Sequence, residues 1–112
     1  MRSKSVTSND GAGSAYVKEM LVSPSYVVLL SVFGYNKAAV TTWLQIHAAS
    51  ATPSANRVPE HTFALGTEDN FSMIIPLTGL SLDKCFLAVS STADKFTAAV
   101  TNDVTICATV QA

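Results

Sequence analysis

The stretch DVTICATVQ, residues 103–111, indicates the fold class because it alternates strictly between apolar and polar positions. A period of two residues is the pattern of a β-strand with one buried face. We predict that the apolar side chains point into a core and that the hydroxyl and thiol groups between them point outward. The inward set is Val104, Ile106, Ala108 and Val110, and the outward set is Thr105, Cys107 and Thr109.

The rest of the chain repeats this signal in short segments. Residues 39–48, AVTTWLQIHA, alternate, and residues 26–35, YVVLLSVFGY, are apolar on both faces, as in a strand at the middle of a sandwich. Turn signals recur every 8 to 14 residues, and no helical period competes. The pattern predicts an all-β fold, a single antiparallel two-sheet sandwich or jelly roll of about eight short strands. We expect these strands over residues 15–23, 26–35, 39–48, 60–66, 71–76, 80–91, 94–100 and 103–111.

The N-terminal segment, residues 1–14, differs from the remainder of the chain. It is polar, rich in Ser and Gly, and has no periodicity. We expect a flexible arm here, and then one β-sandwich domain over residues 15–112. Two roles for the arm are open from sequence: it is idle, or it becomes ordered by adding to a partner.

The composition limits the classes of partner. Charged residues make up only 13% of the 112 residues, and the formal net charge is −1. There is no basic stripe of the kind that binds nucleic acid. The longest apolar run, residues 26–33, is too short for a membrane helix, and the N-terminus lacks a secretory leader, so we expect synthesis in a cytoplasm and no membrane partner. So few charges fit either a neutral lone domain or a subunit packed against its own copies or a larger scaffold.

The two cysteines, Cys85 and Cys107, match no zinc or redox spacing. In a cytoplasm we expect free thiols that act as small apolar packing groups. A disulfide between them is the alternative.

Residues 41–63 hold the only tryptophan, Trp43, and both histidines, His47 and His61. A metal site there would need a third ligand, and Glu60 is the nearest candidate. Glu60 and His61 are adjacent on an expected strand and face opposite ways, so only one of them can join His47. We therefore favour histidines at strand ends, on the surface or in a subunit interface. Trp43 fits a contact surface or the sandwich core equally well.

No arrangement in the sequence indicates catalysis. There is no Gly-x-Ser-x-Gly motif and no glycine-rich phosphate loop. We expect no enzymatic activity, no cofactor and no metal. The residues that we expect in an interface with another subunit are Tyr35, Trp43, His47, Arg57 and His61.

Residues 26–110 resemble the small all-β structural proteins of tailed bacteriophage virions. The resemblance lies in the strand WLQIH at residues 43–47, the loop ending in Pro59, the strand LAVSST at residues 87–92 and the Thr-rich sequence after it. It implies a virion protein assembled in the host bacterial cytoplasm, above all a capsid decoration or cement protein that binds and stabilises the phage head. It also implies a homo-oligomer, with a trimer favoured, and contacts with the major capsid protein or other virion subunits.

A second role is consistent with the same resemblance. The protein would be a receptor- or carbohydrate-binding module of a phage tail, fibre or spike. Its contact surface would then combine Tyr35, Trp43 and His47 with the loop at residues 49–59.

Overall fold

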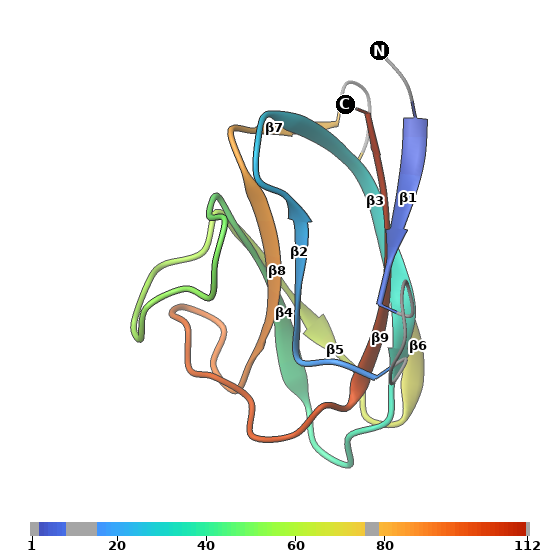
Figure 1. Ribbon diagram of the computed structural model, residues 1–112. Helices are drawn as coiled ribbons and strands as arrows, with labels where there is room; N and C mark the ends of the chain where they lie inside the picture. Colours follow the sequence, from blue (N-terminus) through green and yellow to red (C-terminus); the bar gives the residue numbers. More distant parts are fainter. Residues whose placement is uncertain (1–2, 9–15, 76–78, 112) are drawn as a thin grey trace.

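The computed structural model describes residues 3–8, 16–75 and 79–111, and all regular elements within these ranges are β-strands (Figure 1). The nine strands are β1 (Ser3–Thr7), β2 (Glu19–Ser23), β3 (Val27–Asn36), β4 (Thr42–His47), β5 (His61–Leu65), β6 (Asp69–Ile74), β7 (Leu80–Leu82), β8 (Cys85–Ser90) and β9 (Val104–Gln111). No helix in the described ranges is long and apolar enough to cross a membrane.

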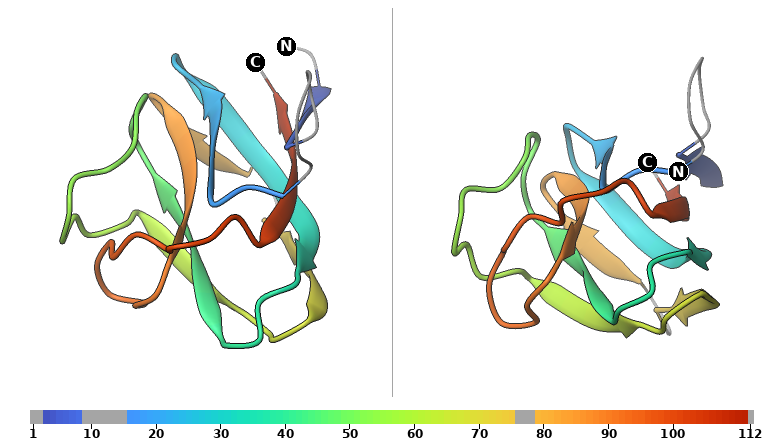
Figure 2. Two further views of the ribbon diagram at one scale, coloured as in Figure 1. Left: turned by 60° about the horizontal axis from the view of Figure 1, so that its bottom comes forward. Right: turned by 90° about the horizontal axis from the view of Figure 1, so that it is seen from below.

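The strands form two antiparallel sheets that face each other (Figures 1 and 2). Sheet A has the order β1-β9-β3-β6, with β7 also paired to β3, and sheet B has the order β2-β8-β4-β5. The main hydrophobic core fills the space between them and draws side chains from both sheets. The predicted all-β, two-sheet antiparallel fold is confirmed.

The inward set predicted for the last strand is confirmed by burial. Val104, Ile106, Ala108 and Val110 of β9 are at most 2% exposed, and all four belong to the core. The strand is hydrogen-bonded on both sides, to β1 and to β3. Burying four apolar side chains contributes roughly 1–3 kcal/mol each, so β9 is a main source of stability.

Two expected strands differ from the observed ones. Residues 80–91 are not one strand, because the exposed residues Asp83 and Lys84 carry the chain from β7 in sheet A to β8 in sheet B. Residues 94–100 form a loop that keeps only an isolated bridge between Ser90 and Ala98. Two consecutive polar residues interrupt the period of two at the crossing, and the core-facing positions change there from Leu82 to Cys85, Leu87 and Val89.

The N-terminal segment corrects the expectation of a flexible arm over residues 1–14. Ser3–Thr7 forms β1, which pairs antiparallel with β9 from Ser3↔Gln111 to Thr7↔Cys107. Val6 packs against the core, and the Ser8 amide donates to the Ile106 carbonyl over 2.8 Å. The unpaired backbone groups at the edge of β9 thus order this segment as a strand, although its composition is polar. The rest of the expected arm, residues 1–2 and 9–14, lies outside the described residues.

Candidate functional site

The outer faces of the two sheets differ, and the difference locates the candidate site. On sheet B, two segments lie over β4 and β8 on the side that faces away from sheet A (Figure 2). We call these segments, residues 48–60 and 91–99, the loop cover. Beneath it lies a second small apolar cluster, in which Phe86, Ala88 and Phe96 are buried and Ala49 packs against them. The outer face of sheet B is therefore closed at its centre by the chain itself.

The two halves of the loop cover are joined through their backbones. The Asn56 amide donates to the Phe96 carbonyl over 2.9 Å, and the Phe96 amide donates to the Arg57 carbonyl over 2.8 Å. Asn56 adopts a φ of 69°, a left-handed conformation that Asn tolerates better than most residues. The two segments consequently form one layer.

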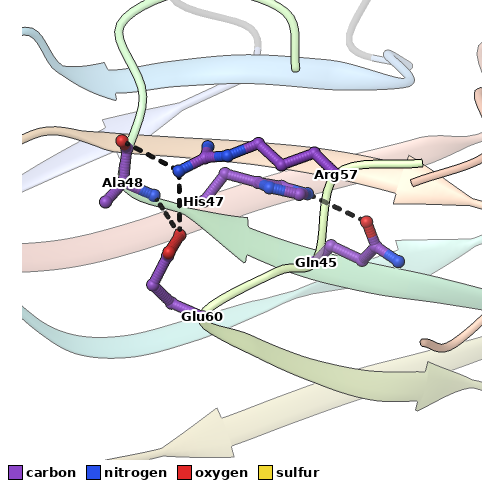
Figure 3. Close-up of polar contacts among 5 residues, drawn as sticks. All are labelled: Gln45, His47, Ala48, Arg57 and Glu60. Atoms are coloured by element: carbon purple, nitrogen blue, oxygen red, sulfur yellow. Dashed lines mark hydrogen bonds and ion pairs between the residues drawn. The ribbon is translucent and has the colours of Figure 1, made fainter. Parts of the chain in front are cut away.

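Gln45 attaches this layer to the sheet. Its side chain is fully buried on β4, and its Nε2 donates to the carbonyls of Thr92 and Lys95 over 3.0 and 2.9 Å. Its Oε1 lies 2.9 Å from Nε2 of His47 (Figure 3). Because an amide oxygen only accepts, His47 Nε2 carries the proton and donates. His47 Nδ1 is then an acceptor, and it is buried with no hydrogen-bond partner among the described residues.

His47 is held as a neutral, buried ring. Its ring lies edge-on to Phe96, with centroids 5.8 Å apart. Burial lowers the pKa of His47 below its ordinary value, the nearby Arg57 guanidinium lowers it further, and the Glu60 carboxylate opposes them. Glu60 Oε1 accepts from the Ala48 amide over 2.6 Å and pairs with Arg57 over 3.5 Å (Figure 3). His47 thus supports the loop cover from beneath.

The register of β4 and β5 decides which neighbour joins His47. Ile46 is opposite His61, so His61 shares the face of Ile46, whereas Glu60 lies on the side of His47. The two imidazoles therefore point to opposite faces. Within the described part of the chain, no three His, Cys, Asp or Glu side chains are close enough to bind a metal ion.

The five residues predicted for an interface do not share one surface. His47 is fully buried, and Arg57 is half-buried and donates to the Ala48 carbonyl. Trp43 is half-buried on the outer side of sheet B, and His61 is exposed on the edge strand β5. Tyr35 lies on sheet A. The contact surface proposed for a carbohydrate-binding role is consequently not assembled in this fold.

Sequence reasoning missed the outer face of sheet A as a surface. Register and alternation place on this face side chains that are mostly hydroxylic or apolar, and among the described ones none is charged. Val28, opposite Gln111 and Ser81 at one end of the face, is buried, and the residues named below are at least partly exposed. Thr105, Cys107 and Thr109 were foreseen as outward residues and Tyr35 as an interface residue; the others were not, because the partners of β9 depend on long-range pairing. The face consists of Ser3, Ser5, Thr7, Ser31, Phe33, Tyr35, Asn70, Ser72, Ile74, Thr105, Cys107, Thr109 and Gln111.

This face carries two projecting side chains and a hollow. Phe33 and Ile74 project from it, with 48% and 78% of their surface exposed. Beside Phe33 lies a hollow of about 360 Å³, which Thr7, Thr105 and Cys107 also line. An exposed aromatic side chain next to a hollow is a form typical of protein contact surfaces.

A separate pocket of about 380 Å³ lies where the ends of β3, β4 and β9 meet. Val40 and Val100 on its wall are 65% and 91% exposed. Thr42 also lines it, and its hydroxyl is buried and finds no hydrogen-bond partner in the described part of the chain. The pocket is mainly apolar, so this unsatisfied hydroxyl is a local cost to stability.

Comparison with known proteins yields no relative: no protein-family model, no curated protein and no solved structure matches the chain. The function is therefore inferred from the residues and their geometry.

Proposed function

We propose that the protein is a structural subunit of a larger assembly, in which the outer face of sheet A is buried against another protein. The resemblance to phage virion proteins gives the setting: a decoration protein on the head of a tailed bacteriophage, in contact with its own copies and with capsid subunits. The single observation that carries the proposal is the absence of charge from the described residues of this face.

The composition of this face is that of an interface. Soluble domains have about a quarter of their residues charged, and their surfaces hold most of them. The centres of protein interfaces, in contrast, are depleted in charged residues and enriched in aromatic ones. The outward positions of four adjacent strands hold no charge and include Phe33 and Tyr35, and they match the second description.

The face is also suited mechanically to assembly. Its side chains stand on strands whose backbones are already hydrogen-bonded to their neighbours. A preformed surface loses little conformational entropy on binding, so more of the contact energy appears as affinity. The loop cover, in contrast, uses its polar groups internally, as the Gln45 and Arg57 hydrogen bonds show.

A pair of matched lysine substitutions tests the proposal. Thr109 lies in the centre of the outer face of sheet A, and Thr62 is an exposed threonine on strand β5 of sheet B. Wild-type protein and Thr62→Lys are expected to co-sediment with purified phage heads that lack the protein, saturating at many copies per head. Thr109→Lys should bind at least about tenfold more weakly, because a buried unpaired ammonium costs several kcal/mol.

Thermal unfolding of both variants verifies that they are folded. If wild-type protein does not bind heads, the decoration role is refuted. If Thr109→Lys binds as well as Thr62→Lys, the assignment of this face is refuted.

A further inference from the structure

We infer that the protein that covers the outer face of sheet A is a second copy of this chain, with Phe33 of each copy seated in the hollow of the other. The inference rests on the proposed function, since it names one partner for the same face. Its geometry is a twofold, face-to-face pairing of two A sheets.

Charge is the first reason for self-pairing. When a surface meets its own copy about a twofold axis, like charges can come face to face and repel. The described residues of this face carry no charge, so such repulsion does not arise. A formal net charge of −1 per chain also adds little long-range repulsion between two copies.

Hydrogen-bonding capacity is the second reason. A hydroxyl group both donates and accepts, unlike an ammonium or a carboxylate. Ser3 and Ser5 of β1 and Thr109 of β9 can therefore bond to the same residues of a second copy, whereas the Thr105 hydroxyl already accepts from the Tyr35 amide over 2.9 Å. A partner rich in acidic or basic side chains would find no opposite charge here.

Shape is the third reason. Phe33 and Cys107 are opposite each other across β3 and β9, and the hollow beside Phe33 is lined by Cys107 as well. Projection and hollow are thus neighbours near the middle of one face. A twofold axis close to them places each aromatic ring at the hollow of the other copy. Aromatic residues seated in central pockets supply much of the binding energy of interfaces.

The area is adequate for a modest interface. Four strands about 4.8 Å apart and about six residues long at about 3.4 Å per residue span roughly 400 Å² in projection. The accessible area is larger because the side chains stand out from the sheet. The projected area is about half of the roughly 800 Å² per partner of a standard interface, so we expect a weak dimer with a Kd on the order of 10 µM or above.

Sedimentation across a concentration series tests the pairing in the full chain without heads. The wild-type protein should shift from monomer to dimer near the expected Kd. Phe33→Asp should raise the Kd at least about 30-fold, because a central anchor is lost and a charge is placed in the interface. The matched control is Leu21→Asp, since Leu21 is 42% exposed on β2 of sheet B and should leave the dimer intact.

Thiol cross-linking locates the interface. Cys107 is half-buried on the outer face of sheet A, whereas Cys85 is fully buried and its burial raises its pKa to about 12, which suppresses reaction. A short bismaleimide should join two Cys107 thiols, and the covalent dimer should disappear in Cys107→Ser and in Phe33→Asp. If Phe33→Asp does not fold, Thr109→Lys takes its place.

A wild-type monomer at all concentrations, a trimer, or a dimer unaffected by Phe33→Asp would overturn the inference. The outcomes also separate the two proposals. A monomer that still decorates heads refutes only the self-pairing, and a cross-linkable dimer that does not bind heads refutes only the decoration role.

Discussion

Replacing Gln45 by Leu is the most informative change to the loop cover. The side chain is fully buried, makes two short hydrogen bonds to the carbonyls of Thr92 and Lys95 and a longer one of 3.5 Å to that of Ala93, and makes one with His47. Leu has a similar size but makes none of these bonds. The substitution therefore separates the hydrogen-bonding role of Gln45 from its packing role.

The expected loss in the free energy of unfolding depends on whether water can reach the polar groups that lose their hydrogen bonds to Gln45. The carbonyls of Thr92 and Lys95 lie in partly buried and exposed residues and can turn to water, so their bonds cost about 1 kcal/mol each. The His47 Nε2–H is buried and loses its only acceptor, which costs about 1–3 kcal/mol. Burial of the added apolar surface returns roughly 1 kcal/mol. The free energy of unfolding should fall by about 3 kcal/mol.

Urea unfolding measures this loss, and limited proteolysis should cut residues 91–99 faster in the variant. Gln111→Leu, on a half-buried glutamine of β9, is the control and should stay within about 0.5 kcal/mol of wild type. In Gln45→Leu/His47→Leu both partners are apolar, so the double variant should be at least about 1 kcal/mol more stable than the sum of the single losses predicts. A loss below about 1 kcal/mol for Gln45→Leu, or strict additivity, would refute the reasoning.

Three further predictions concern stability. Thr42→Val removes a buried hydroxyl without a partner and keeps the side-chain shape, so urea unfolding should show a gain of about 1 kcal/mol; a loss would contradict the orphan assignment. Burial lowers the pKa of His47 below its ordinary 6.5, so the free energy of unfolding should be constant above about pH 7 and should decline as the pH falls through 6.5 towards the lower folded-state pKa. Chemical unfolding should show a smaller decline for His47→Gln and the wild-type decline for His61→Gln. Equal declines for the two variants would exclude His47 as the cause. Gly34→Ala should lower the free energy of unfolding by about 3 kcal/mol or more, because the added Cβ would come within 1.8 Å of a β9 carbonyl oxygen. In Gly66→Ala the added Cβ meets nothing nearer than 3.6 Å, so this control should be nearly neutral. Similar Tm values for the two variants would contradict this.

The fold class could be predicted from sequence because burial on one face of a strand imposes a local period of two. Val104 to Val110 show this most clearly, and the structure buries the predicted side. The polar pair Asp83 and Lys84 interrupts the alternation, but such a pair also fits a turn within one sheet, so the change of sheet could not be predicted from it. Nor could the pairing of Ser3–Thr7, because it depends on a free edge almost the whole chain length away.

The candidate site was less predictable than the fold. The alternation of side chains along a strand correctly predicted that only one of Glu60 and His61 can lie on the side of His47. The register of β4 and β5 shows that this residue is Glu60. The burial of His47 depends on where two irregular loops lie, and no periodic pattern encodes that. The outer face of sheet A is assembled from four strands that are distant in sequence, so its lack of charge becomes visible only after the strands are placed side by side.

The position of β9 has a consequence for how the chain acquires its structure during synthesis. This strand lies between β1 and β3, yet it is the last of the described strands to leave the ribosome. Until it emerges, β1 has no neighbour among the described strands of sheet A, and β3 lacks its hydrogen-bonded neighbour on one side. Sheet A should therefore close only after translation of residues 104–111, and its formation should be slow because the pairing spans nearly the full chain. A nascent chain stalled before Val104 should remain a target for chaperones and proteases.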